Sequence, residues 1–260
     1  MPRAGFGIAG ADRVGRRTGV EAVCSALESL GVDHVFAYPG TEITELLEGL
    51  RTSGLRTVVP TSELPAAFMA LGYARASGRV GVAAVIPGPG LAYALPGLAE
   101  ARYDSVSLLV LTGSKDPRAP FDVGEAVRPV VKALLEPTAA DELASAVRDG
   151  HALAAAGEPG PVVVRLPPVA LAARVGSAPA PTGETPQLPA HQVAAVAERL
   201  AAARHVTLLF GQGAAGAAAE AVELAERLGA AVLTTTSSSR TSLEWTLSLR
   251  SASGSPATRR

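Results

Sequence analysis

From residue 18 onward, segments whose apolar residues have helical spacing alternate with short, continuous apolar runs. Apolar residues three or four positions apart predict helices, and short runs rich in Val, Leu and Ile predict strands. Helices are expected at 20–30, 41–50, 63–77, 92–102 and 141–156, and strands at 33–37, 56–59, 80–86, 107–111 and 161–166. This alternation is typical of α/β proteins, so we expect a doubly wound parallel sheet over 18–168, preceded by a tail at 1–17.

Local signals support several of these boundaries. Gly31 and Gly78 follow predicted helices, where glycine is a common terminator. Thr41 is expected to cap the helix that runs to Leu50. The almost continuous apolar run at 80–86 is expected of a strand that is covered on both faces.

A second, incomplete α/β domain is expected after a linker. Residues 169–190 are rich in Pro, Ala and Gly, which favours a linker. Within 191–235 the pattern predicts helix 192–203, strand 205–210, a glycine loop, helix 217–228 and strand 230–235. Residues 236–260 are mostly Ser, Thr and Arg without a clear period, so they are expected to be an atypical tail. Two strands and two helices do not close a stable sheet.

Composition excludes several classes of protein. The 260 residues are 48% apolar and 18% charged with a net charge of -1, which indicates a globular protein and argues against nucleic-acid or anionic-membrane partners. The uncharged stretch 80–99 is dense in Gly and Pro, so it does not predict a membrane span. The single Cys24 excludes an internal disulfide and fits a reducing compartment. No apolar leader is seen at the N-terminus, so a cytoplasmic location is expected.

Glu63 is the main candidate for chemistry. It follows a predicted strand and begins a helix of small residues, which places a carboxyl at the mouth of the sheet. Open α/β sheets bind ligands at the carboxyl ends of their strands. A poorly hydrated carboxyl there is suited to hydrogen-bonding a heterocycle nitrogen. The alternative is an ordinary glutamate at a helix start, which the helix dipole also favours.

Five motifs, in order, resemble a known family. They are Val35–Gly40, Glu63 with Gly72-Tyr73-Ala74-Arg75-Ala76, Gly88-Pro89-Gly90, Asp104-Ser105 with Leu108–Gly113, and Gly160–Val164 with Leu166-Pro167. Together they are similar to the N-terminal pyrimidine-binding domain of thiamine-diphosphate enzymes related to acetolactate synthase and 2-keto acid decarboxylases. The likeness covers about residues 18–168, and 191–235 resembles the start of that family's central domain.

The resemblance implies roles for particular residues. Glu63 would be catalytic, bonding the N1′ nitrogen of the cofactor's aminopyrimidine and so starting its activation for decarboxylation or carboligation of a 2-keto acid. Pro39 and Gly40 would shape the pyrimidine pocket, and Gly88 and Tyr93 would belong to the next cofactor-binding loop. Such an enzyme would be a lyase or transferase, working as a dimer or larger homo-oligomer, or with a partner chain.

The sequence also departs from the family. Ser62 stands where the family usually has His, Tyr93 where acetolactate synthases have Asn, and Ser114 where they have Gln. These departures indicate a different decarboxylase or carboligase, or a degenerate copy. The family holds the diphosphate through Mg²⁺ with a Gly-Asp-Gly motif and a later Asn. This chain has no Asn, so we assign it no metal ligand and expect Mg²⁺ on a domain absent from it.

The glycine loop 211–216 leaves a further possibility open. Gly211-Gln212-Gly213-Ala214-Ala215-Gly216 follows a predicted strand and opens a helix, as a dinucleotide fingerprint does. The next strand ends in Thr234-Thr235-Thr236 rather than in the acidic residue that such sites use. The leading hypothesis is therefore one half of a thiamine-diphosphate enzyme, interrupted and inactive alone. The alternatives are a subunit completed by a partner chain and a non-catalytic NAD- or FAD-binding module.

Overall fold

The structure is a computed structural model that describes residues 17–114, 119–175 and 189–235. It divides into two compact units, Met1–Pro181 and Thr182–Arg260. The predicted tail at 236–260 lies outside the described residues, as does the predicted tail before residue 17. Among the helices that are described, none combines the length and apolar content needed to cross a bilayer.

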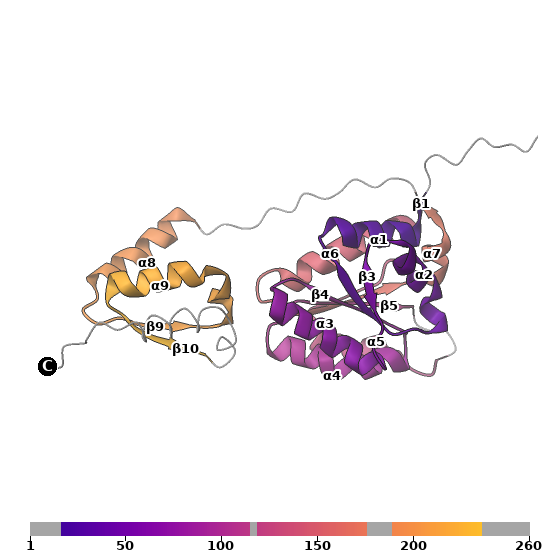
Figure 1. The fold of residues 1–260 in the computed structure, drawn as a ribbon, viewed down its shortest axis with the longest axis horizontal. Helices are drawn as coiled ribbons and strands as arrows, with labels where there is room; N and C mark the ends of the chain where they lie inside the picture. The colour runs from indigo at the N-terminus through magenta and orange to yellow at the C-terminus, as the bar shows by residue number, and fades with distance from the viewer. Residues whose placement is uncertain (1–16, 115–118, 176–188, 236–260) are drawn as a thin grey trace, which may run out of the picture. The chain divides into compact units, whose positions relative to one another are not determined.

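The first unit is built on a six-stranded sheet in which every strand pair is parallel (Figure 1). In spatial order the strands are β3 (Arg56–Val58), β2 (His34–Ala37), β4 (Gly81–Val85), β5 (Leu108–Gly113), β7 (Pro161–Leu166) and β6 (Ala133–Leu135). The chain reverses direction across the sheet between β2 and β4 and so covers both faces with helices. The predicted doubly wound parallel sheet is confirmed.

Each face of the sheet buries its own hydrophobic core. One face packs against α1 (Gly19–Ser29), α2 (Thr44–Thr52), α6 (Leu143–Ala155) and α7 (Pro168–Ala172), and the other against α3 (Glu63–Ser77), α4 (Pro89–Tyr103) and α5 (Val123–Val127). Successive residues of β4 point to opposite faces, since Val82 and Ala84 join the first core and Ala83 and Val85 the second. Apolar residues on both faces explain the continuous run in the sequence.

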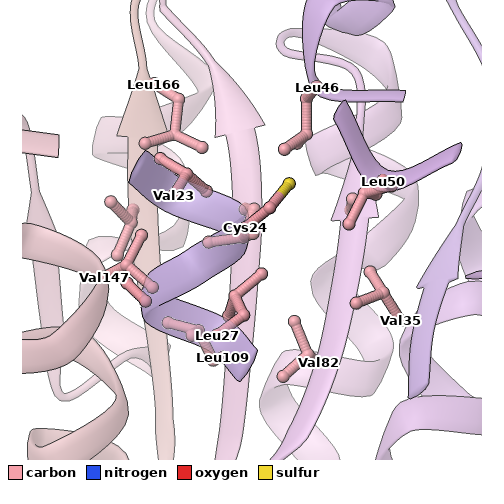
Figure 2. Packing of buried hydrophobic residues seen from close by; sticks show 14 of the residues in the cluster. Val23, Cys24, Leu27, Val35, Leu46, Leu50, Val82, Leu109, Val147 and Leu166 are labelled. Carbon is pink, nitrogen blue, oxygen red and sulfur yellow. The ribbon is translucent and has the colours of Figure 1, made fainter. Parts of the chain in front are cut away.

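The single cysteine belongs to the first of these cores. Figure 2 shows Cys24 and Leu27 of α1 among side chains of α2, α6 and the strands β2, β4, β5 and β7. Burial, with a contribution from Glu28, raises the pKa of the Cys24 thiol to about 11. Cys24 is therefore a neutral packing residue at ordinary pH.

Two boundaries differ from the sequence-based expectations. Thr41 does not cap a helix, because Thr41–Ile43 form a 3₁₀ turn and α2 begins at Thr44. The start of the stretch expected to be a linker is folded into α7 and β8 (Arg174–Val175). Strand β8 pairs antiparallel with β1 (Arg17–Thr18), and Leu171 and Val175 are buried. The burial of Leu171 and Val175 thus folds this stretch, although its composition favours a linker.

The second unit contains a smaller α/β arrangement. It comprises α8 (Ala190–Ala202), β9 (Thr207–Phe210), a 3₁₀ segment η4 (Gln212–Ala217), α9 (Ala218–Leu228) and β10 (Ala231–Thr234). Strands β9 and β10 are parallel, and Leu209 lies opposite Leu233 with both side chains exposed. Helix α9 ends at Gly229, whose left-handed backbone (φ 55°) suits glycine.

Candidate functional site

Helix α3 places Glu63 in a buried position at the carboxyl ends of the strands. The helix begins at Glu63 after an extended Ser62, and it buries Ala66, Ala67 and Ala70. These small side chains let the helix lie very close to the sheet: a Cβ built on Gly81 of β4 would lie 2.0 Å from the Ala70 carbonyl oxygen. Glu63, the first residue of this helix, is therefore also buried and is 6% exposed.

The Glu63 carboxyl has no partner within the described part of the chain. No hydrogen bond or ion pair joins it to another described residue, although it is one of three buried polar or charged side chains there. Buried polar groups are normally hydrogen-bonded, because an unmet group loses its solvation without compensation. A buried carboxyl without a protein partner is consistent with a group that receives its partner from a ligand.

The loop after β4 forms the surface nearest to this carboxyl. Gly88 adopts φ 62° and ψ -118°, a conformation that favours glycine, and it turns the chain into α4 at Pro89. A Cβ built on Gly90 would lie 2.9 Å from Glu63 Oε1 and 3.2 Å from Glu63 Cγ. The backbone of the first turn of α4 therefore lies directly against the carboxyl.

The loops after β2 and β5 reach the same place. A Cβ on Gly40 would lie 2.1 Å from Ile86 Cγ2, and one on Gly113 would lie 3.1 Å from both Pro87 Cδ and the Glu42 carbonyl oxygen. Sequence reasoning did not identify Ile86 and Pro87 as part of the site. An isoleucine at the end of an apolar strand carries no signal of such a role.

The structure brings some of the predicted residues together and leaves others apart. Gly40 and Gly88 lie in the loops that meet beside Glu63, and Pro39 is exposed at the end of β2. Tyr93 is 61% exposed on the outer side of α4, whereas Gly90, Leu91 and Ala94 form that helix's buried side. Ser62 and Ser114 are both half-buried at ends of their elements.

Exposed apolar side chains are also found on the neighbouring helix α3. Leu64 and Phe68 of α3 are each 41% exposed, and Met69 is also exposed. Helices α3 and α4 pack closely, since a Cβ on Gly97 of α4 would lie 2.6 Å from Ala67 Cβ. We call the exposed residues Leu64, Phe68, Met69 and Tyr93 the α3–α4 face. It begins one residue after Glu63.

The opposite end of α3 is hydrogen-bonded throughout. Tyr73 donates its hydroxyl proton to Asp33 Oδ1, and Arg79 Nη1 lies 2.8 Å from Asp33 Oδ2. His34 Nδ1 lies 2.9 Å from Asp33 Oδ1. The Tyr73 bond, then those of His34 and Arg79, hold the pKa of Asp33 well below its usual range. We call Asp33, His34, Tyr73 and Arg79 the Asp33 cluster.

A second ionic group lies at the end of β7. Arg165 is 8% exposed, and its guanidinium pairs with Asp122, the N-cap of α5, and with Glu136 at 2.6 Å. These bonds, with Asp122 the largest contributor, raise the pKa of Arg165. The group connects α5 to the sheet, and because both of its carboxylates are paired, it offers no free acid.

Neither the glycine loop 211–216 nor a cluster of metal-binding side chains adds a second candidate site among the described residues. Residues 211–216 lie after β9, and the Thr235 amide donates to the Phe210 carbonyl at 3.0 Å where an acidic residue would favour a dinucleotide. Within the described ranges, no group of three or more His, Cys, Asp or Glu side chains is arranged to hold a metal ion.

Comparison with known proteins relates the first unit to a known family. Residues 17–119 match the family described as thiamine pyrophosphate enzyme, N-terminal TPP binding domain. The isozyme 3 large subunit of acetolactate synthase from Escherichia coli K12 is 38% identical over 158 residues, covering 58% of this chain and 28% of that protein. Chloroplastic acetolactate synthase 3 of Brassica napus is 36% identical over 159 residues, covering 58% of this chain and 24% of that protein.

Two further relatives match more of the chain. The probable 2-ketoarginine decarboxylase AruI of Pseudomonas aeruginosa is 34% identical over 237 residues, which cover 84% of this chain and 41% of that protein. An X-ray structure from Mycobacterium smegmatis, assigned to a thiamin diphosphate-dependent enzyme, superimposes with a TM-score of 0.74 at 26% identity and covers 85% of this chain and 45% of that one. The chain thus spans less than half of the length of each of these relatives. Nothing in the comparisons favours the dinucleotide hypothesis.

Proposed function

Residues 17–119 are the N-terminal TPP binding domain of a thiamine pyrophosphate enzyme of the acetolactate synthase and decarboxylase type, and we propose that Glu63 holds the cofactor's aminopyrimidine there. The observation that carries this proposal is that Glu63 is only 6% exposed as a residue and that its carboxyl has no hydrogen-bond partner among the described residues. Its neighbourhood supports the proposal, because three strand-end loops converge beside it.

The proposed chemistry assigns one task to each part of the site. When bound, thiamine diphosphate supplies a thiazolium ring that accepts the electrons released when a 2-keto acid loses CO₂. Glu63 would share a proton with the pyrimidine N1′ atom, and its buried position strengthens that hydrogen bond because little water competes. Pro39 and Gly40 would form one wall of the pyrimidine pocket and Gly88 the other, with Tyr93 at the outer rim.

The diphosphate and its Mg²⁺ are proposed to be held elsewhere. Mg²⁺ needs oxygen ligands in near-octahedral geometry, and the sequence has neither the Gly-Asp-Gly motif nor any Asn. We therefore propose that the chain does not turn over a 2-keto acid by itself. It would contribute the pyrimidine half of a decarboxylase or carboligase, and the departures at Ser62, Tyr93 and Ser114 would bear on which 2-keto acid is used.

The α3–α4 face supports a proposal about partners. No charged residue lies between Glu63 and Arg75 or between Arg79 and Glu100 along the sequence. Exposed apolar side chains on two packed helices are suited to contact with another polypeptide. We propose that a domain carrying the diphosphate site, supplied by a partner chain, covers this face and closes over Glu63, and that without it the exposed faces of two copies pair with each other. Light scattering of the chain alone should therefore detect self-association.

Thiamine tests the role of Glu63 without the metal. It carries the aminopyrimidine but no diphosphate, so its binding reports on this half of the site. Saturation-transfer NMR on the full chain should detect contact with the pyrimidine protons. In Glu63→Gln, affinity should fall by about tenfold or more, because a hydrogen bond to a charged group is lost. Glu45→Gln is the matched control, since Glu45 lies in the first turn of the neighbouring helix α2.

Thiamine binding by the wild type, Glu63→Gln and Glu45→Gln distinguishes the possible outcomes. Binding to the wild type and to Glu45→Gln, with loss in Glu63→Gln, is the expected result. Equal affinity in all three would remove Glu63 from the pyrimidine site. A wild-type chain that binds no thiamine at all would overturn the proposed function.

A further inference from the structure

Ile86 lies where two loops of the site approach each other. It directly follows strand β4, between the loop after β2 and the first turn of α4. A Cβ on Gly40 would lie 2.1 Å from Ile86 Cγ2, and a Cβ on Gly90 would lie 2.5 Å from Ile86 Cγ1. The two glycines therefore face the same side chain from different directions.

The reason for glycine at 40 and 90 follows from these contacts. Real Cβ atoms essentially never approach another atom so closely, so either residue as alanine would force Ile86 or the backbone to move. Neither glycine has a positive φ. What requires glycine at both positions is thus the close approach of Ile86, and at Gly90 also that of Glu63, and not an unusual backbone conformation.

The branching of Ile86 matches the arrangement of its neighbours. A β-branched side chain has two γ carbons that diverge from one Cβ and has few rotamers. In Ile86 one γ carbon meets each glycine. Valine keeps both γ carbons with a smaller side chain, whereas leucine keeps the volume of isoleucine but has a single γ carbon. Shape and size can therefore be tested separately at this position.

The contact with Gly90 connects Ile86 to the carboxyl. Gly90 lies between them, since its Cβ would be 2.5 Å from Ile86 Cγ1 and 2.9 Å from Glu63 Oε1. Pro87, the next residue, packs on Gly113 at the end of β5. A shift of Ile86 would therefore move both the Gly90 backbone, which lies against Glu63, and the loop that contains Gly40.

We propose that Ile86 is a positioning residue whose two γ carbons set the separation of the Gly40 and Gly90 loops around Glu63. This inference rests on the proposed function as far as it concerns the cofactor. The geometric part, that side-chain shape at 86 fixes the two loops, holds without any ligand. The side chain acts on the pyrimidine site through Gly40 and Gly90 rather than as a catalytic residue.

The experiment compares Ile86→Val with Ile86→Leu in the full chain. Both variants keep an apolar side chain, and both should melt close to the wild type. With glycine-labelled protein and no ligand, the NMR signals of Gly40 and Gly90 should be unchanged in the valine variant and displaced in the leucine variant. In a thiamine titration, valine should keep affinity within about twofold and leucine should lose about tenfold.

The outcomes distinguish this inference from the proposed function. A leucine variant with wild-type glycine signals and wild-type thiamine affinity would overturn the inference, as would equal losses in both variants. If the wild type binds no thiamine while the glycine signals still depend on branching, the proposed function fails and the positioning role of Ile86 is supported. A purely volumetric role would give the reverse order, with leucine tolerated and valine impaired.

Discussion

The two ends of helix α3 differ in whether their polar side chains have hydrogen-bond partners. At its start, Glu63 is buried and has no hydrogen bond with another described residue. At its end, Tyr73 bonds Asp33, and Arg75 forms ion pairs with Glu100 and Asp104. The same helix thus carries a carboxyl without a partner at one edge of the sheet and fully paired groups at the other.

This difference separates a structural use of polar groups from a functional one. A polar group that stabilises the fold is paired, because pairing is what offsets its desolvation. A buried group that is left unpaired reduces stability, and at the strand ends of an open α/β sheet it is a candidate ligand-binding group. The comparison predicts that changes at the first end of α3 affect ligand binding, and that changes at the second end affect stability.

The largest effect is expected from Glu63→Leu. Thiamine affinity should fall by about 10- to 100-fold, because a charged hydrogen-bonding group worth about 1.5–3 kcal/mol is removed. The melting temperature should stay the same or rise, because leucine replaces a buried carboxyl without a partner. Calorimetry and a thiamine titration on the same sample measure both quantities. A clear fall in melting temperature would mean that Glu63 has a structural role, and the contrast between the two ends would be lost.

Gly90→Ala should affect binding and stability together. The new methyl group would lie 2.5 Å from Ile86 Cγ1 and 2.9 Å from Glu63 Oε1. Overpacking of this kind costs about 1–3 kcal/mol of unfolding free energy. The displaced carboxyl should also bind thiamine more weakly. Urea unfolding measures the first effect, and an unchanged midpoint would show that the loop can move away without cost.

Gly72→Ala is the matched change towards the other end of α3. Nothing lies within 4 Å of a Cβ at Gly72, which is exposed inside the helix. Alanine should therefore raise the unfolding free energy by up to about 1 kcal/mol through helix propensity alone. Thiamine affinity should not change. A loss of stability here would indicate a contact with another chain at that position, which size-exclusion chromatography could then detect.

The sequence predicts most of the sheet because its central strands carry long apolar runs. Pro161–Leu166 is found with its predicted bounds, and β5 extends only slightly beyond its predicted range. Strand β6 was not predicted, since three residues at Ala133–Leu135 are too few to show a period. Strand β8 is shorter still, with two residues, and its neighbours are rich in alanine and proline.

The site could be predicted only in part, for a related reason. Glu63 could be placed from the sequence, because strand ends in open α/β sheets gather ligand-binding groups. The contact of Ile86 with Gly40 depends on the register between β2 and β4, where Phe36 lies opposite Ala83. Such register is a property of the folded sheet, and no local pattern in the sequence encodes it.

The smallest effect is expected from Asp33→Asn at the paired end of α3. The bonds from Tyr73, His34 and Arg79 keep the pKa of Asp33 below its ordinary value, so the folded state favours the ionised form. That stabilisation is complete above the unfolded-state pKa of about 3.9 and is lost as the pH falls towards the folded-state value. Because the Asp33 cluster is exposed, solvent screens it and the contribution is small.

Melting curves recorded from pH 7 downward should therefore differ in slope between the wild type and Asp33→Asn. The wild type should lose stability more steeply below about pH 4, and the two curves should approach each other at the acid end. Thiamine affinity at neutral pH should be equal in both proteins, because Asp33 lies at the far end of α3 from Glu63. Parallel melting curves would show that the cluster contributes nothing. Weaker thiamine binding in Asp33→Asn would show instead that the two ends of α3 are coupled, and that the pairing at one end supports the unpaired carboxyl at the other.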